Sequence, residues 1–185
     1  MPAADEQQLI SRAKEGSHEA FRVLVERHMK QAYDVAYGFV GNHDAATDIT
    51  QEAFVAAHRA LGGFRGDSEF STWLHRIVVN LALTSVKRDR HRAEREVDME
   101  HPAARMAIQE LPYGEAADLR EHVERAIHEL PTLQRAVVIL RHVDGLSTRQ
   151  VSRILRCSEG TVKTHLYRGL KKLKDRLEFL RAEQR

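Results

Sequence analysis

The sequence predicts an all-α fold, with two helical domains joined by a flexible linker. Apolar residues recur at intervals of three and four along most of the chain, and no segment shows the alternation typical of a half-buried strand. Residues 97–117 interrupt this pattern, because they are acidic and contain two prolines and a glycine. The chain has 185 residues, which is enough for two small domains. We therefore expect domains at 1–96 and 118–185.

Four helices are predicted in the first domain. Ser17 is suited to cap the second helix, and Gly41 and the pair Gly62-Gly63 are suited to end the second and third. The expected bounds are 5–15, 18–40, 44–61 and 70 to about 90. In the fourth helix one apolar stripe should be buried, and it comprises Phe70, Trp73, Leu74, Ile77, Val78 and Leu81.

Four more helices are predicted after the linker, which itself could hold a helical turn near 103–110. Their expected bounds are 118–130, 132–143, 148–155 and 159 to about 180. Ser147 and Gln150 have the spacing of a capping box, and Ser158 is suited to cap the last helix. Only residues 156–158 separate the last two helices, which is a helix-turn-helix layout. The predicted buried stripe of the last helix is Val162, Leu166, Leu170, Leu173 and Leu177.

The charge distribution favours a polyanionic partner for the second domain. The net charge of the chain is +2, but residues 131–185 hold 13 Lys and Arg against 5 Asp and Glu, a balance of +8. Arg and Thr can bond base edges, while Lys neutralises phosphate. The candidate base-reading residues are Lys163, Thr164, Tyr167, Arg168, Thr161 and Ser158, and the candidate phosphate contacts are Arg149, Arg153, Lys171 and Lys172. The alternative is a basic amphipathic helix that only keeps the protein soluble.

Several function classes are excluded by the sequence. The N-terminal stretch MPAADEQQ is polar, no apolar run could span a bilayer, and the single cysteine allows no internal disulfide, so we expect a cytoplasmic protein without direct membrane insertion. There is no P-loop, metal-ligand spacing or nucleophile–base pair, so we expect no enzyme, cofactor, metal or small-molecule substrate. Cys157 is interpreted as a small core residue rather than a redox switch. His128, His142 and His165 are interpreted as solvated or DNA-facing.

Residues 130–173, LPTLQRAVVILRHVDGLSTRQVSRILRCSEGTVKTHLYRGLKKL, resemble region 4 of bacterial sigma factors, which reads the −35 promoter element. They also resemble the DNA-binding domain of LuxR-type regulators. Arg156 stands where the sigma pattern often has Gly, and Ser152 where it often has Ala. The stretches DAATDITQEAFVAAHRAL and FRGDSEFSTWLHRIVVNLALTSVKR resemble sigma region 2. A LuxR-type regulator would instead carry a receiver or ligand-binding domain, so the chain resembles the small group 4, or extracytoplasmic-function, sigma factors.

This resemblance implies roles for residues of the first domain. Asp48, Gln51 and Glu52 share one polar helix face, which the resemblance implies binds core RNA polymerase; otherwise it is only a solvated face. The loop after Gly63 and the helix that follows it correspond to the −10 reader, where aromatic rings and amides can hold unstacked bases. The implied −10 residues are Asn80, Phe64, Arg65, Asp67, Ser68 and Thr84, with Lys87 and Arg88 as phosphate contacts.

Phe70 and Trp73 are assigned to the core, and Thr84 stands where the family often has Asp or Asn. The resemblance also implies promoter DNA as a partner and control by an anti-sigma factor. A linker of this length reaches about 70 Å only when fully extended, and that is the span of two turns of DNA. We therefore expect the isolated protein to bind promoters weakly. The alternatives are a dimeric helix-turn-helix regulator and a helical adaptor, and the adaptor leaves the +8 segment unexplained.

Overall fold

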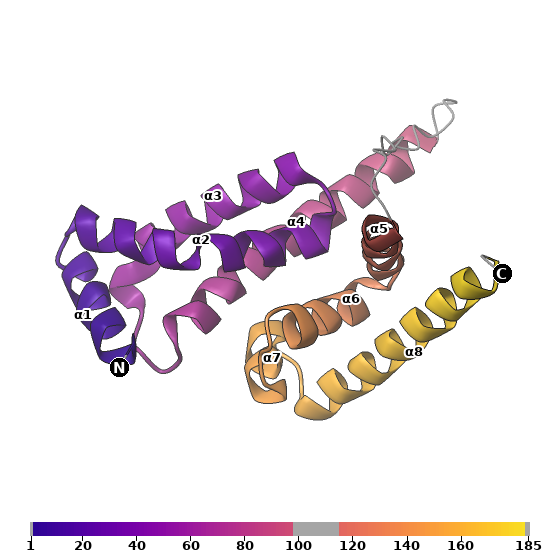
Figure 1. Ribbon diagram of the computed structural model, residues 1–185. Coiled ribbons are helices and arrows are strands. Elements are labelled where there is room, and N and C mark those ends of the chain that lie inside the picture. Colours follow the sequence, from indigo (N-terminus) through magenta and orange to yellow (C-terminus); the bar gives the residue numbers. More distant parts are fainter. Residues whose placement is uncertain (1, 98–114, 184–185) are drawn as a thin grey trace.

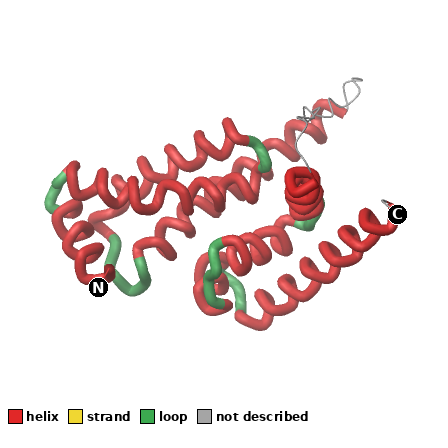
Figure 2. Tube along the Cα trace, in the orientation of Figure 1, coloured by secondary structure: helices red, strands yellow, loops and turns green. Residues whose placement is uncertain are grey.

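The protein is helical in both of its parts (Figures 1 and 2). The computed structural model describes residues 2–97 and 115–183, and within these ranges it contains no strand. The N-terminal domain comprises α1 (Pro2–Lys14), α2 (His18–Val40), α3 (His43–Ala60), the short 3₁₀ helix η1 (Leu61–Gly63) and α4 (Phe70–Val97). The C-terminal domain comprises α5 (Glu115–His128), α6 (Thr132–Val138), the π-helical turn η2 (Ile139–Val143), α7 (Thr148–Leu155) and α8 (Glu159–Glu183).

Local sequence signals set the ends of the N-terminal helices as expected. The Ser17 side chain accepts a hydrogen bond from the Ala20 backbone N–H (3.3 Å), which caps α2. Gly41 ends α2 in the left-handed conformation (φ 64°), and its N–H donates to the Tyr37 carbonyl. Asn42 then caps α3 by accepting from the Ala45 N–H (2.9 Å). Two helices are thus separated by only two residues, so α2 and α3 lie side by side (Figure 1).

Several expected helix bounds are wrong. The helix that begins at Phe70 was expected to end near Arg90, but it continues to Val97, because no Gly or Pro interrupts the run. The helix expected at 132–143 changes type at Ile139, where the Asp144 N–H donates to the Ile139 carbonyl in the five-residue spacing of a π-turn (3.2 Å). The expected helical turn near 103–110 lies outside the described residues, and α5 begins at Glu115, inside the expected linker.

The buried stripe of α8 also differs from the expectation. Val162 is fully buried, but Leu170 is 40% exposed. The position that faces α6 is Gly169, where an added Cβ would lie 2.9 Å from Val138 Cγ2. Because a glycine lets the two helix backbones approach closely, the contact runs over Gly169 and turns the neighbouring leucine outward. A helical pattern that counts only large apolar residues does not include glycine, so it cannot predict such a contact.

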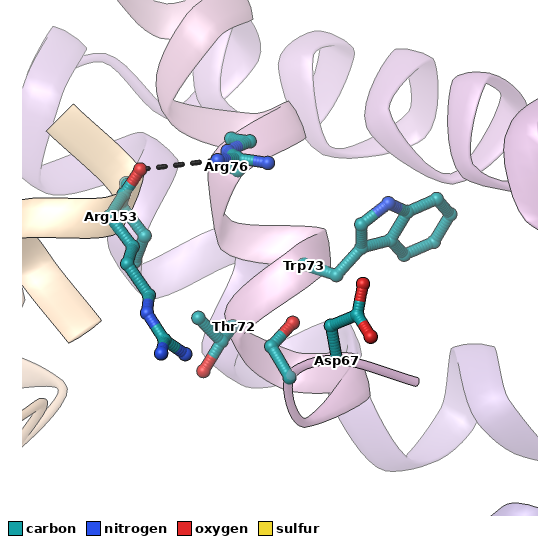
Figure 3. A pocket seen from close by; sticks show the side chains of 7 residues that line it. Asp67, Thr72, Trp73, Arg76 and Arg153 are labelled. Atoms are coloured by element: carbon teal, nitrogen blue, oxygen red, sulfur yellow. Dashed lines mark hydrogen bonds between the residues drawn. The ribbon is translucent and has the colours of Figure 1, made fainter. Parts of the chain in front are cut away.

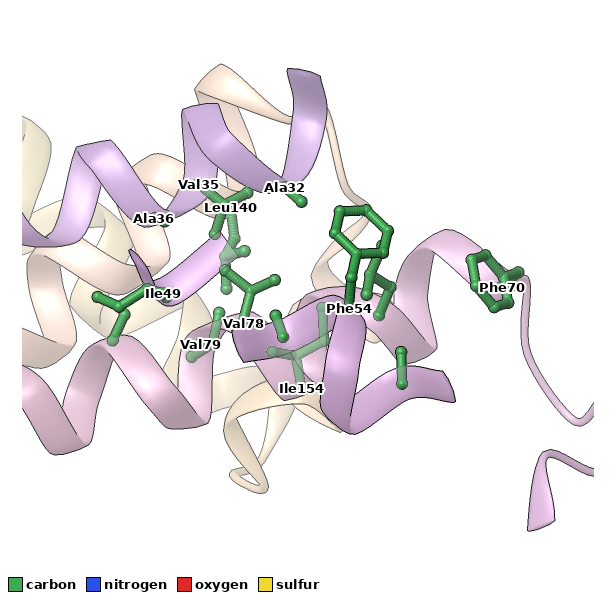
Figure 4. Packing of buried hydrophobic residues seen from close by; sticks show 14 of the residues in the cluster. Ala32, Val35, Ala36, Ile49, Phe54, Phe70, Val78, Val79, Leu140 and Ile154 are labelled. Carbon is green, nitrogen blue, oxygen red and sulfur yellow. The ribbon is translucent and has the colours of Figure 1, made fainter. Parts of the chain in front are cut away.

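The two domains pack against each other and share one buried core. Val78 of α4 and Val35 of α2 belong to the same cluster as Leu140 of η2 and Ile154 of α7 (Figure 4). Glycines allow the close approach in two places. A Cβ on Gly38 would lie 3.0 Å from Ile139 Cδ1, and a Cβ on Gly41 would lie 2.6 Å from His128 Nε2. The sequence predicted two domains but no contact between them.

Candidate nucleic-acid interface

Helices α7 and α8 form a tight helix-turn-helix. The predicted capping box is present: Gln150 N–H donates to Ser147 Oγ (3.2 Å), and Ser147 N–H donates to Gln150 Oε1 (2.8 Å). Ser158 Oγ accepts from the Thr161 N–H (3.0 Å) and so caps the start of α8. The turn between the helices passes through Arg156, whose φ of 53° is the only positive value for a non-glycine residue in the described part of the chain.

Replacing Arg156 by glycine is expected to stabilise the C-terminal domain. A side chain in the left-handed region costs about 1–2 kcal/mol, and glycine removes this strain while adding freedom to the unfolded chain. The expected net gain in unfolding free energy is therefore about 0.5–1 kcal/mol. Urea unfolding followed by circular dichroism measures it. Gly66, with φ 78° and nothing within 4 Å of an added Cβ, supplies the opposite control, since Gly66→Ala should lose a similar amount. A destabilised Arg156→Gly protein would contradict this account.

The outer face of α8 presents the candidate −35 residues to solvent. Tyr167 is 70% exposed, and Thr161 at the first turn is half-buried. Thr164 Oγ1 donates back to the Gly160 carbonyl (3.0 Å), which fixes its methyl group and hydroxyl on this face. The remaining candidates are all exposed: Ser158, Lys163, Thr164 and Arg168, together with the candidate phosphate contacts Arg149, Arg153, Lys171 and Lys172. Helices α7 and α8 thus carry several exposed basic side chains, and α8 adds the exposed ring of Tyr167.

One face of α4 carries the candidate −10 residues that lie on a helix. Asn80 and Thr84 are exposed one turn apart, and Thr84 Oγ1 donates to the Asn80 carbonyl (2.8 Å). Lys87 and Arg88 continue the exposed surface one turn further along. An amide, a hydroxyl and two cations in line can follow one strand of nucleic acid, with the amide free to bond a base edge.

The loop before α4 contains both exposed and buried residues. Arg65 and Asp67 are exposed and Ser68 is half-buried, whereas Phe64 is only 7% exposed. The Phe64 ring lies against Phe70 (6.0 Å between centroids) and Trp73 (5.2 Å), and the Lys14 ammonium lies over its face. In this structure Phe64 therefore anchors the loop in the core and does not offer a ring for base stacking, unlike the expectation. Phe70 is buried as expected, and Trp73 is half-buried.

A cavity of about 360 Å³ lies between this loop and α7 (Figure 3). Its N-terminal walls are Asp67 and Ser68 of the loop and Thr72, Trp73 and Arg76 of α4, and its C-terminal wall is Arg153 and Ile154 of α7. Sequence reasoning missed Thr72 and Arg76. The signal was available, since they precede Asn80 at intervals of four and extend the same helix face backwards.

The polar face predicted on α3 is present at the surface. Asp48, Gln51 and Glu52 are all exposed. Val55, one turn further on, is 49% exposed and lines a shallow hollow of about 250 Å³ with Phe21, Phe54, His58 and Arg59. Carboxylates beside an exposed apolar side chain are typical of a protein-binding surface rather than of a face that binds nucleic acid.

Cys157 and the histidines do not form a reactive or metal-binding centre in the described part of the chain. Burial raises the pKa of the Cys157 thiol, which disfavours the reactive thiolate. Among the described residues no group of three His, Cys, Asp or Glu side chains could hold a metal ion. The same residues include no helix that is both long and apolar enough to cross a membrane.

A buried titratable pair joins the two domains. His75 Nε2 of α4 lies 3.9 Å from Asp144 Oδ2, and the two side chains are only 1% and 2% exposed. The separation is too long for a hydrogen bond. Burial lowers the pKa of His75 to about 4, with a contribution from His28. Burial raises the pKa of Asp144 to about 7, with a contribution from Asp34. Between about pH 4 and pH 7 the pair is therefore largely uncharged rather than a salt bridge.

Comparisons with known proteins agree with this division of the chain. Residues 24–92 match the family model "Sigma-70 region 2", and residues 120–173 match "Sigma-70, region 4". The chain is 34% identical over 186 residues to the RNA polymerase sigma-H factor of Pseudomonas aeruginosa, covering 96% of both chains. It is 34% identical over 183 residues to the ECF RNA polymerase sigma-E factor of Escherichia coli K12, covering 95% of both.

Two solved structures have the same fold over most of their length. CnrH, in complex with the cytosolic domain of CnrY, has a TM-score of 0.70 and 27% identity, with coverage of 94% of this chain and 97% of that one. RpoE of Bartonella quintana, in complex with the anti-sigma factor NepR, has a TM-score of 0.70 and 26% identity, with coverage of 85% and 96%. The two matched regions, in this order and with near-complete relatives, establish that the chain belongs to the extracytoplasmic-function sigma factors of the sigma-70 family.

Proposed function

We propose that this sigma factor contacts promoter DNA with two separate surfaces and core RNA polymerase with a third. The exposed basic face of α8 reads the −35 element, and the face of α4 from Asn80 to Arg88 contacts the −10 strand. The polar face of α3 around Asp48, Gln51 and Glu52 binds polymerase. The observation that carries the proposal is the pairing, within one chain, of a capped helix-turn-helix with a second, separate polar and basic helix face.

The protein acts by positioning DNA and polymerase, and as a sigma factor it is not an enzyme. Its place of action is the cytoplasm, where core polymerase and the chromosome are found. We further propose that an anti-sigma factor controls it. The support is that RpoE was solved in complex with the anti-sigma factor NepR and CnrH in complex with the cytosolic domain of CnrY, and that these structures match 85% and 94% of this chain.

The proposed −35 surface is tested by replacing Arg168 with alanine. Loss of an arginine that bonds a base edge should cost about 1–3 kcal/mol of binding, which corresponds to a drop of about fivefold to 150-fold in initiation from a −35-dependent promoter. Run-off transcription with purified core polymerase measures it. The matched control is Arg12→Ala, an exposed arginine of α1, which should leave initiation within about twofold. Equal activity of the two variants would remove Arg168 from the −35 surface.

The same assay separates the alternatives. A conventional operator-binding regulator would bind its duplex without polymerase and would not confer initiation on the core enzyme. An adaptor would do neither. Promoter-dependent run-off transcripts that require both the protein and core polymerase are the expected result.

A further inference from the structure

Arg156 ends α7 in a backbone conformation that does not suit an arginine. Its φ of 53° and ψ of 45° place it in the left-handed region, where the Cβ of a residue other than glycine lies too close to the following carbonyl oxygen. The backbone at this position has a clear structural task, because the N–H groups of Arg156 and Cys157 both donate to the Ser152 carbonyl and close the helix. Glycine would perform this task without strain.

The side chain of Arg156 has no corresponding task within the fold. It is exposed, and in the described part of the chain it makes no hydrogen bond, ion pair or aromatic contact. Residues 145–174 contain eight Lys and Arg against a single acidic residue, Glu159. A guanidinium with mostly cationic neighbours is attracted to an external anion rather than to its own surface.

The position of Arg156 fits the backbone of DNA better than a base edge. In a helix-turn-helix the first helix crosses the phosphate backbone, while the start of the second enters the major groove. Arg149, Arg153 and Arg156 follow one another at intervals of four and three, which places them along one side of the first helix, α7. All three are exposed. Because Arg156 comes two residues before Ser158, which caps α8, their Cα atoms lie at most about 7 Å apart, and Arg156 borders the proposed −35 surface.

We propose that Arg156 is a phosphate-binding residue of the −35 surface, which continues the line of Arg149 and Arg153 along the DNA backbone. The inference rests on the proposed function and adds to it a residue that determines affinity rather than sequence. A guanidinium can donate two parallel hydrogen bonds to one phosphate. This contact exists only when DNA is bound, whereas the strain of the turn is present in the free protein as well. The same residue therefore lowers the stability of the domain and raises its affinity for DNA.

Two substitutions separate the charge of Arg156 from its backbone strain. Arg156→Gln removes the charge but keeps a side chain in the left-handed region, and Arg156→Gly removes both. In complex with core polymerase, each variant should bind a promoter with a −35 element more weakly than the wild type and with a weaker dependence on salt. One lost phosphate contact lowers the log–log slope by about 0.9, so a rise from about 50 to about 200 mM salt should reduce wild-type binding about threefold more than binding by either variant. Fluorescence anisotropy of a labelled promoter duplex measures this.

The stability of the free protein should increase for only one of the two variants. The urea midpoint should rise for Arg156→Gly and stay near the wild-type value for Arg156→Gln. A loss of DNA affinity in a more stable protein cannot come from partial unfolding. Arg156→Lys keeps the charge and should keep the salt slope. Arg12→Gln, which removes one charge from an exposed position of α1, is the matched control and should also keep the slope.

The loss should not depend on the promoter sequence, since a phosphate carries no base information. The ratio of wild-type to Arg156→Gln affinity should agree within about twofold on promoters that differ by single base pairs in the −35 element, whereas the ratio for Arg168→Ala should vary among them. Equal salt slopes for the wild type and Arg156→Gln would overturn the proposal, and so would a loss confined to one base pair. If the wild-type protein and core polymerase give no promoter-dependent initiation, it is instead the proposed function that fails.

Discussion

Asp144→Asn is expected to stabilise the protein at pH 8, with a much smaller gain at pH 4.5. Burial holds the pKa of Asp144 at about 7, against 3.8 for the free side chain. Above pH 7 the folded protein therefore contains a buried carboxylate without a hydrogen-bond partner at Oδ2 among the described residues. A neutral amide of the same shape removes this charge, and the expected gain in unfolding free energy is about 2–4 kcal/mol.

The same substitution should reveal a pH dependence that the wild-type protein conceals. Between pH 4 and 6.5 the folded pair holds one proton on Asp144, and the unfolded chain holds one proton on His75. The two contributions to the pH slope therefore cancel. In Asp144→Asn only His75 remains, and the unfolded state binds the extra proton, so stability should rise by about 1.4 kcal/mol per pH unit over this range.

The reciprocal variant His75→Gln should have the opposite slope. In this variant Asp144 stays protonated in the folded protein up to about pH 7, whereas in the unfolded chain it loses its proton near pH 4. The free energy of unfolding should therefore fall as the pH rises from about 4 to 7. Urea unfolding at half-unit steps from pH 4.5 to 8 measures all three profiles, with the nearby His28 and Asp34 unchanged in each. Parallel profiles for the three proteins would show that the pair does not titrate as described.

Phe70→Ala should be the most destabilising single substitution that we consider in the N-terminal domain. Phe70 is 1% exposed and its ring contacts those of His28 (5.1 Å), Phe64 (6.0 Å) and Trp73 (5.5 Å). Truncating a fully buried phenylalanine leaves a cavity and costs about 3–5 kcal/mol. The loss also removes the anchor of the loop before α4, because Phe64 packs on the same ring. Denaturant unfolding and the exposure of Trp73 by fluorescence both report the change.

Tyr167→Ala is the matched control for this prediction. Tyr167 is another large aromatic residue, but it is 70% exposed on α8. Its truncation should change the unfolding free energy by no more than about 0.5 kcal/mol. If Tyr167→Ala were as destabilising as Phe70→Ala, burial would not be the cause of the loss.

Most of the helical framework could be predicted from the sequence, because local signals specify it. Ser17, Gly41 and the Ser147–Gln150 capping box each act within four residues of their own position, and all were found where expected. The exposed residues of α8 were also predictable, since they lie opposite Val162, which is buried. Their contacts with DNA stay predictions.

The remaining features depend on contacts between distant parts of the chain. Nothing local to Phe64 shows that its ring turns inward onto Phe70. The position of Gly169 against Val138 and the pairing of His75 with Asp144 both require knowledge of which helices meet. The contact between the domains is of the same kind, because Gly38 is an ordinary helical residue until Ile139 is placed above it.

Gly41 gives the interface between the domains a consequence for sequence variation. Gly16 and Gly41 both have positive φ, but an added Cβ meets nothing at Gly16 and meets the His128 ring at Gly41. Substitution at Gly16 meets only backbone strain, whereas substitution at Gly41 also disturbs the neighbouring domain. Among relatives that keep this interface, position 41 should therefore remain glycine as long as position 128 carries a ring. A larger residue at position 41 would require a smaller side chain at position 128.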